Sequence, residues 1–132
     1  MIVDSSALVA IVLAEPGHEV LVQHLARAPV LGVGAPTLAE TGIVLTNRLG
    51  IAGKSLLARL LQEATAETIP WSAAHWPVAV AAFTRFGKGR HPAALNFGDC
   101  LTYATCRLAG RPLLCTGSDF PQTDLDVVTS VR

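Results

Sequence analysis

Short apolar runs alternate with longer amphipathic segments along the chain, and this alternation is the main guide to its fold. The apolar runs predict β-strands, which cover residues 2–3, 30–33, 68–71, 113–115 and 126–131. The segments between them predict helices, at residues 5–14, 18–28, 36–49, 53–67, 72–86 and 98–108. Strands that alternate with helices are typical of a parallel sheet covered on both faces. We therefore expect an α/β fold with a central parallel sheet of four to five strands, formed by a single domain over residues 1–132.

Turn and cap residues set the expected helix ends. Ser5 or Ser6 can cap the first helix, and Ser72 can cap the fifth. The Glu-Pro-Gly segment at residues 15–17 breaks the first helix, and Gly50 is a stop signal for the third. With these ends, each predicted strand is followed directly by a helix or a loop.

The composition is that of a folded globular domain. A chain of 132 residues that is 51% hydrophobic and 15% charged has too much apolar surface to stay disordered, and its length suits one core. Ten Lys and Arg residues balance ten Asp and Glu residues, so the formal net charge is zero. Bulk attraction to nucleic acid or to a membrane surface is therefore not implied, and any such binding must come from a local patch.

The chain also lacks the usual signs of export or membrane insertion. Its apolar N-terminal segment has no basic stretch before it and is interrupted by Asp4, which argues against a signal peptide. No uncharged apolar run approaches the roughly 20 residues of a membrane span. The three cysteines form no CxxC motif and have no His-rich partner segment, which argues against zinc. We expect a soluble, cytoplasmic protein in a reducing compartment.

Four acidic residues stand alone in apolar surroundings. Asp4 is the only charged residue in 1–14, and Glu40 is the only one between Arg27 and Arg48. Asp99 is isolated in the same way, and Asp119 follows the apolar strand at residues 113–115. A lone carboxylate in an apolar stretch is costly unless something pairs with it. Asp4 and Asp119 also follow predicted parallel strands, where ligands bind in open α/β sheets.

Each of these acids has a simpler explanation. Asp4 can cap the first helix, and Asp99 can favour a helix N-terminus through the helix dipole. Glu40 can lie on an exposed helix face, and Asp119 can be an ordinary turn residue. If all four converge, their mutual repulsion requires a divalent cation, and an all-oxygen ligand set selects Mg²⁺ or Mn²⁺ over zinc.

A short basic segment precedes Asp99. Arg85, Lys88, Arg90 and His91 bring three of the ten formal cations into seven residues. Such a segment either contacts phosphates beside the acidic residues or forms a solvated loop. The aromatic residues are expected in the core or at an interface rather than as base-stacking platforms, and they are Trp71, Trp76, Phe83 and Phe86.

Several motifs, taken in order, resemble one known family. They are Ile2-Val3-Asp4-Ser5-Ser6-Ala7-Leu8, Leu38-Ala39-Glu40, Asn96-Phe97-Gly98-Asp99-Cys100 and Thr116-Gly117-Ser118-Asp119-Phe120. Together they resemble the PIN-domain ribonucleases, specifically the VapC toxins of bacterial toxin–antitoxin modules. The segment at residues 86–95, Phe-Gly-Lys-Gly-Arg-His-Pro-Ala-Ala-Leu, is similar to one VapC subgroup. The resemblance covers essentially the whole chain.

The resemblance implies a PIN-like fold and an Mg²⁺- or Mn²⁺-dependent endoribonuclease. Its catalytic and metal-binding acids correspond to Asp4, Glu40, Asp99 and Asp119. Many relatives carry a further acidic or amide residue just before the last acid, where this chain has Gly117-Ser118. That departure weakens the expectation of a second metal site. Asp124 also resembles a family feature, and we expect it to support the site or the fold rather than to bind metal. Ser5, Ser6 or Thr116 can hydrogen-bond the carboxylates.

The same resemblance implies partners. They are an RNA substrate, a cognate VapB-type antitoxin whose tail lies over the active site, and a second copy in a homodimer or a toxin–antitoxin hetero-oligomer. The high apolar content is compatible with an apolar groove for an antitoxin helix.

Three alternatives remain. The first is a PIN nuclease outside a toxin–antitoxin system, in RNA processing or as a flap-type DNA nuclease; the small size favours the toxin. The second is an aspartyl-phosphate phosphatase or receiver domain. Such phosphatases usually need an acid two positions after the first aspartate, and Ser6 stands there. The third is a catalytically inactive binding module, although all four family acids are present.

Overall fold

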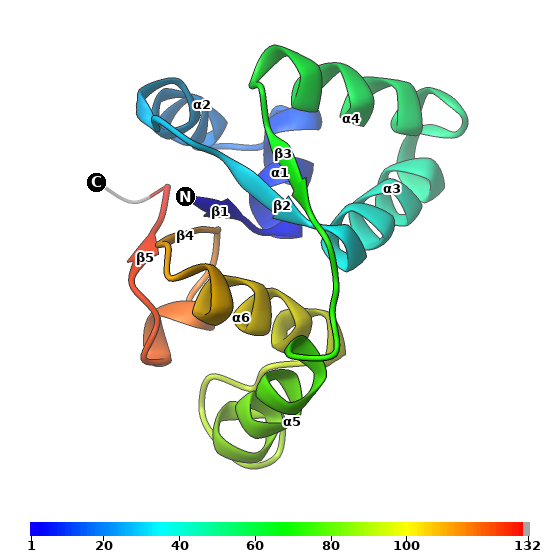
Figure 1. Ribbon diagram of the computed structural model, residues 1–132. Helices are drawn as coiled ribbons and strands as arrows, with labels where there is room; N and C mark the ends of the chain where they lie inside the picture. The colour runs from blue at the N-terminus through cyan, green and yellow to red at the C-terminus, as the bar shows by residue number, and fades with distance from the viewer. Residues whose placement is uncertain (131–132) are drawn as a thin grey trace.

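A five-stranded parallel sheet forms the centre of the molecule, as a computed structural model that describes residues 1–130 shows (Figure 1). Its strands follow the order β3-β2-β1-β4-β5, and every neighbouring pair is parallel. The strands are β1 (Ile2–Val3), β2 (Gly32–Gly34), β3 (Glu67–Ile69), β4 (Leu113–Leu114) and β5 (Val127–Val128). The expected α/β class and parallel sheet are confirmed. The end of the fifth expected strand, Val131, lies outside the described residues, as does Arg132.

Six α-helices and one short 3₁₀ helix connect the strands (Figure 1). They are α1 (Ser5–Val12), α2 (His18–Arg27), α3 (Ala35–Leu49), α4 (Ala52–Glu63), α5 (His75–Phe86), α6 (Phe97–Ala109) and η1 (Phe120–Gln122). Helices α5 and α6 pack together on one face of the sheet, whereas α1, α2 and α4 cover the other. Helix α3 follows β2 directly and contacts α1, α4 and α6. Both faces of the sheet are therefore covered, as parallel sheets require.

Strand alternation divides the core into two layers. Successive side chains of a strand point to opposite faces. Ile2 and Leu113 accordingly join the cluster beneath α5 and α6. Val3 and Leu114, the next residues of the same two strands, join the cluster beneath α1, α2 and α4. All four are almost completely buried, so even two-residue strands are held firmly between the helical layers.

Some element ends differ from the sequence prediction. The fourth helix ends at Glu63 rather than at residue 67, because residues 67–69 pair with β2 in the register Gly32↔Glu67. Long-range strand pairing thus overrides local helix propensity. The fifth helix begins at His75, not just after Ser72, because the Ser72 backbone N–H donates to Nδ1 of His75 in a turn before the helix.

The order of the strands places a ligand site. The chain builds β1, β2 and β3 outward in one direction and then returns to add β4 and β5 on the other side of β1. The order therefore reverses between β1 and β4. Ligands of open α/β sheets bind at such a reversal, outside the carboxyl ends of the strands. Within residues 1–130 no helix is long and apolar enough to cross a membrane.

Candidate active site

Asp4 lies directly at the end of β1, in the middle of the sheet. Its side chain is buried, with the residue 3% exposed, and it forms the N-cap of α1. Oδ2 accepts hydrogen bonds from the backbone N–H of Ser6 at 3.1 Å and from the Ser6 hydroxyl at 2.6 Å. The helix cap is therefore Asp4, which was one of the caps considered from the sequence, and not Ser5 or Ser6. Capping fixes one carboxylate oxygen and leaves the other to a different partner.

The second oxygen of Asp4 is held from α6. The Thr102 hydroxyl donates to Oδ1 of Asp4 at 3.0 Å, and it lies 3.1 Å from the hydroxyl of Thr37 on α3. Both threonines are buried. A chain of two hydroxyl groups, one from α6 and one from α3, thus orients this carboxylate. Buried carboxylates with such partners hold a defined direction.

Ser6 also joins the end of β1 to the loop after β4. Its Oγ accepts a hydrogen bond from the backbone N–H of Thr116 at 3.1 Å. The backbone N–H of Asp4 donates to the carbonyl of Leu114 at 2.9 Å. The expectation that Ser6 hydrogen-bonds a carboxylate is confirmed. Asp119 lies three residues beyond Thr116, where it is exposed and occupies the N-cap position of η1. The loop that carries Asp119 is therefore held at its start by the bond between Thr116 and Ser6.

Asp99 occupies the first turn of α6. Its backbone N–H donates to Oδ1 of Asn96 at 2.9 Å, and its own Oδ2 accepts from the Asn96 backbone N–H at 3.1 Å. This reciprocal pair is a capping box. The cap uses Oδ2 of this half-buried carboxylate and leaves Oδ1 outside the capping box.

Glu40 approaches the same turn from α3. Its carboxylate lies against Gly98, where a Cβ atom would come within 2.3 Å of Oε2 and 2.9 Å of Cδ. A side chain at position 98 would therefore push the Glu40 carboxylate out of its present place. Glu40 is half-buried, not on a fully exposed helix face, and it reaches the residue next to Asp99.

The electrostatics of Asp99 show that the four acids share one field. Its pKa is raised to about 6, chiefly because burial disfavours the charged form. The hydrogen bond from Asn96 lowers the pKa, and the negative charges of Asp4, Asp119 and Glu40 raise it further. Asp4, Glu40 and Asp119 therefore lie close enough to Asp99 to interact with it electrostatically, beside the reversal of strand order.

The donor set suits a hard cation that keeps part of its water shell. All four groups are carboxylates, which favour Mg²⁺ or Mn²⁺. In the described part of the chain, no three His, Cys, Asp or Glu side chains are gathered closely enough to hold an ion by themselves. Mg²⁺ commonly binds through one or two carboxylates and several waters, so a closed cage of protein ligands is not needed. The negative charges of Asp4, Asp119 and Glu40 around Asp99 provide a reason for a cation, since positive charge would relieve their repulsion.

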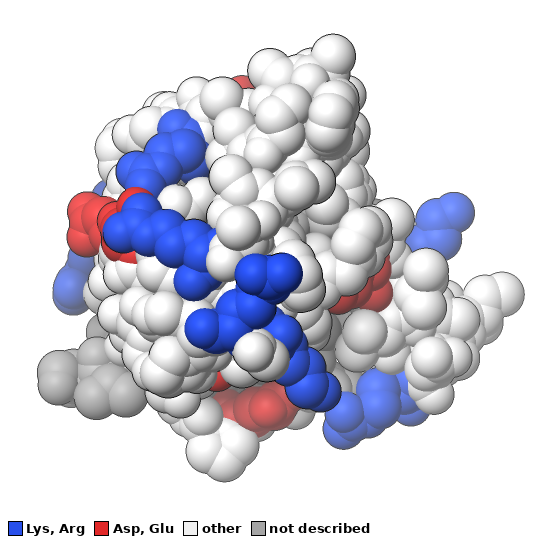
Figure 2. Space-filling view, turned by 90° about the horizontal axis from the view of Figure 1, so that it is seen from below, with Lys and Arg blue, Asp and Glu red and all other residues white. Residues whose placement is uncertain are grey.

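The basic segment forms a compact loop after α5. The Arg85 guanidinium donates to Oδ2 of Asp124 at 3.0 Å, and the Arg90 guanidinium carbon lies 5.6 Å from the centre of the Phe83 ring. Lys88 is exposed. Figure 2, in which the α5 end of the molecule faces the viewer, shows Lys and Arg side chains gathered across this face, with acidic side chains at its margins.

His91 and Asp124 have structural partners. Nδ1 of His91 accepts from the backbone N–H of Ala93 at 3.0 Å, which shapes the loop. Asp124 accepts from Tyr103 at 2.7 Å and also pairs with Arg107, and these bonds hold the pKa of the carboxyl below its usual range even though burial opposes the shift. Asp124 therefore fastens the loop after β4 to α5 and α6, in agreement with its expected supporting role.

Comparison with known proteins identifies the family. The PIN domain model matches residues 1–125. Ribonuclease VapC36 of Mycobacterium tuberculosis is 50% identical over 129 residues, which cover 96% of this chain and 91% of that protein. The chain belongs to the VapC ribonuclease family of PIN domain proteins.

Solved VapC structures share the fold at much lower identity. A crystal structure of VapC20 from Mycobacterium tuberculosis, described as a sarcin–ricin loop cleaving toxin, superposes with a TM-score of 0.77 at 20% identity. That match covers 94% of this chain and 95% of the other. VapBC2 from Rickettsia felis, bound to a DNA fragment from its promoter, gives a TM-score of 0.76 at 17% identity and covers 97% and 96% of the two chains. The predicted PIN-like fold is confirmed.

Sequence reasoning did not find the threonines that orient Asp4 in this VapC-family chain. Thr102 and Thr37 lie inside helices, where threonine is a weak signal of any role. Asn96 was recognised as part of a motif, but not as the reciprocal cap of Asp99. An N-x-x-D pattern at the start of a predicted helix could have indicated this cap.

Proposed function

We propose that this VapC-family protein is an Mg²⁺- or Mn²⁺-dependent endoribonuclease and the toxin of a toxin–antitoxin pair in the cytoplasm. The observation that carries the proposal is the convergence of four carboxylates, in which the negative charges of Asp4, Asp119 and Glu40 act on the half-buried Asp99. A bound divalent cation would activate a water molecule and stabilise charge on the attacked phosphate. RNA is the substrate class that the family name of the relatives supports.

Each residue of the site then has a role. Asp4, whose carboxylate is fixed by three donors, and Asp99 would hold the cation directly or through water. Glu40 and Asp119 would complete the ligand shell or orient the attacking water as a general base. Ser118 stands where many relatives have an acid, and this supports one tightly held cation rather than two.

The decisive test uses purified protein and a labelled single-stranded RNA. We expect cleavage with Mg²⁺ or Mn²⁺, loss of cleavage in excess chelator, and recovery when metal is restored. Asp4→Asn removes a ligand and should abolish cleavage, while its melting curve confirms that it is folded. Undiminished cleavage in chelator would overturn the metal dependence, and an active Asp4→Asn variant would overturn the assigned site. Sequencing of RNA ends in cells that express each protein would identify the cleaved RNA.

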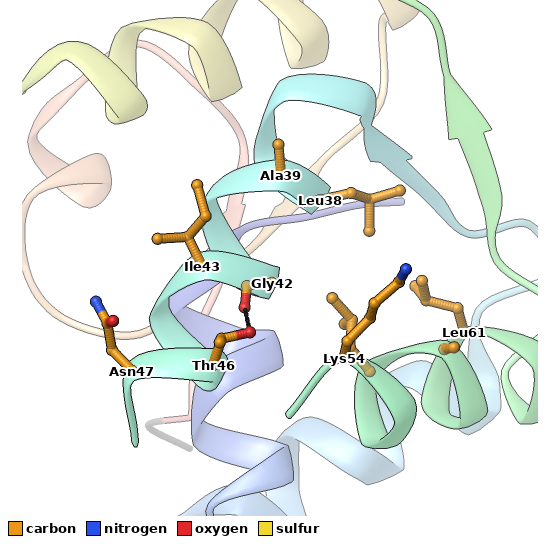
Figure 3. Close-up of a pocket in the computed structure, with 10 residues that line it drawn as sticks. Leu38, Ala39, Gly42, Ile43, Thr46, Asn47, Lys54 and Leu61 are labelled. Atoms are coloured by element: carbon orange, nitrogen blue, oxygen red, sulfur yellow. Dashed lines mark hydrogen bonds between the residues drawn. The ribbon is translucent and has the colours of Figure 1, made fainter. Parts of the chain in front are cut away.

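The antitoxin partner is supported by a groove between α3 and α4 (Figure 3). The groove has a volume of about 560 Å³ and a mainly apolar lining. Gly53 lets α4 approach closely, since a Cβ there would lie 2.5 Å from the Leu45 backbone on α3. Leu38 on α3 faces Lys54 and Leu61 on α4 across the groove, and Ile43 also belongs to its lining (Figure 3).

An amphipathic helix of a VapB-type antitoxin would suit this groove. Apolar residues at helical spacing would enter the space between α3 and α4, which is a recurring mode of peptide recognition. Lys54 provides a positive charge for an acidic residue on the partner. The toxin–antitoxin complex of the Rickettsia felis relative supports a partner of this kind. The complex would then be a toxin–antitoxin hetero-oligomer.

A further inference from the structure

Helix α5 carries an apolar face that the described chain does not cover. Trp76 is 60% exposed, Val80 is 56% exposed and Phe83 is 42% exposed. These residues are four and three positions apart, so they lie on one side of the helix. Single exposed apolar residues are common, but a row of them with two aromatic rings is typical of a surface that binds a ligand or another macromolecule.

The same part of the chain is entirely without acidic residues. Residues 68–98 contain three basic residues and no Asp or Glu, whereas the rest of the chain has seven basic and ten acidic residues and a formal net charge of −3. Arg85 shares its charge with Asp124. Lys88 and Arg90 are therefore the cations best placed for an external anion, and both are exposed.

The aromatic face and the basic loop touch one another. Gly87 packs tightly on Phe83, where a Cβ atom would come within 2.5 Å of the ring. The Arg90 guanidinium lies beside the same ring. One continuous surface thus runs along α5 and onto the loop.

The loop also leads to the acids. The Lys88 backbone N–H donates to the carbonyl of Leu95 at 3.0 Å, and Leu95 immediately precedes Asn96, the cap residue of the helix that carries Asp99. The basic loop and the first turn of α6 are therefore joined by a hydrogen bond and by the chain itself. A linear ligand bound along this surface would therefore extend toward the carboxylates.

We propose that the exposed face of α5 and the basic loop together bind single-stranded RNA, with bases stacked on Trp76 and Phe83 and phosphates on Lys88 and Arg90. The inference deepens the proposed function, because it names the surface that would hold the substrate. Proteins that bind single strands combine aromatic rings with a cationic path for the backbone. Because stacking tolerates any base, this surface would supply affinity for RNA of any sequence and would direct the RNA toward the carboxylates. Trp76 and Phe83 are exposed, so the core location, one of the two expected for them, is wrong.

The charge pattern disfavours a second copy as the occupant. In a two-fold symmetric dimer the same patch meets itself. A second copy docked here could compensate Lys88 and Arg90 only with acidic residues from outside this surface, because residues 68–98 contain none. A polyanion fits this surface better than an identical cationic one.

The test measures binding of a fluorescent, unstructured RNA oligonucleotide in chelator, so that cleavage does not interfere. Trp76→Ala should weaken binding about tenfold with little change in salt dependence, because it removes a stacking contact. Trp76→Phe should retain most of the affinity. The double variant Lys88→Ala/Arg90→Ala should make the slope of log K against log salt shallower by about 1.4, from roughly 0.7 per phosphate. The control is Ile51→Ala, which alters a side chain that is 92% exposed between α3 and α4.

The outcomes separate this inference from the proposed function. Equal RNA affinity of Trp76→Ala and wild type would overturn the RNA surface. So would a change in sedimentation mass in Trp76→Ala with unchanged RNA affinity, since that result would indicate a dimer interface. Metal-dependent cleavage by the wild type, measured in parallel, tests the proposed function by itself. Binding that depends on Trp76 without any cleavage would support the surface and overturn the nuclease.

Discussion

The hydroxyl of Thr102 donates a hydrogen bond of 3.0 Å to Oδ1 of Asp4, across 98 residues of sequence. This bond connects the second turn of α6 to the end of β1. Ser6 holds the other oxygen of the same carboxylate. Asp4 is therefore oriented by two separate elements before any ligand binds.

Thr102→Val should show how much the Thr102 hydroxyl contributes to orienting Asp4 and how much it contributes to the stability of the fold. Valine keeps the shape of threonine but removes the donor, so we expect cleavage and Mn²⁺ affinity to fall about tenfold, as for other residues that support metal ligands. The lost hydrogen bond should lower the free energy of unfolding by about 1 kcal/mol. Isothermal titration with Mn²⁺ and melting curves measure the two effects.

Thr102→Ser is the matched control for this variant. Serine keeps the hydroxyl and loses a buried methyl group, which should cost about 1 kcal/mol of stability. Metal affinity should nevertheless stay near that of the wild type. If the serine and valine variants lost metal affinity equally, Thr102 would act only through packing.

The raised pKa of Asp99 predicts a specific dependence on pH. Because the pKa of the folded protein is about 6, above that of an unfolded aspartate, the folded protein binds the extra proton between these values. Stability without metal should therefore fall as the pH rises toward about 6 and then level off. Asp99→Asn lacks this titration, so the wild type should lose melting temperature relative to the variant over that range. Parallel melting curves of the two proteins in chelator provide the measurement.

Cleavage should show the opposite trend. A metal ligand must be deprotonated, so activity of the wild type should decline as the pH falls below about 6. Asp99→Asn should be inactive at every pH while remaining folded. If the melting temperatures of wild type and Asp99→Asn moved together with pH, the raised pKa of Asp99 would be refuted.

Gly98→Ala should displace Glu40 without unfolding the protein. The new methyl group would occupy the space of the Glu40 carboxylate, which is the mobile end of a flexible side chain and can swing away. We expect a large loss of cleavage with little change in melting temperature. Gly42→Ala, in the same helix as Glu40, is the control, because a Cβ there meets Leu57 at an ordinary 3.9 Å. Equal cleavage by the two variants would show that the position of Glu40 does not matter.

Ala58→Glu should block the groove between α3 and α4. Ala58 lines this groove and is exposed, so a glutamate there adds charge and bulk to an apolar lining without disturbing the core. Capture of a co-expressed VapB-type antitoxin should fall, while cleavage by the free protein remains. Ser55→Glu places the same side chain on an exposed position of α4 outside the groove and should bind normally. Unimpaired capture by Ala58→Glu would exclude the groove as the docking site.

The sequence by itself determined the alternation of strands and helices and the isolation of the four acids. Both depend on neighbours in the chain. The apolar runs before Asp4 and Asp119 indicate strands without reference to the rest of the fold, and a parallel sheet follows from the helices between them. The supporting role of Asp124 was also anticipated, although only from its resemblance to a family feature.

The tertiary structure decided the contacts that join distant segments. The order β3-β2-β1-β4-β5 places the ends of β1 and β4 side by side, and this brings Asp4 and Ser6 next to the start of the Asp119 loop. The close packing of Glu40 on Gly98 and the bond from Thr102 to Asp4 depend on where α3 and α6 settle on the sheet. Exposure of Trp76 is of the same kind, because an aromatic residue in an amphipathic helix is buried only if another element covers it. Local sequence patterns cannot predict these contacts, because each contact depends on the packing of residues that lie far apart in the chain.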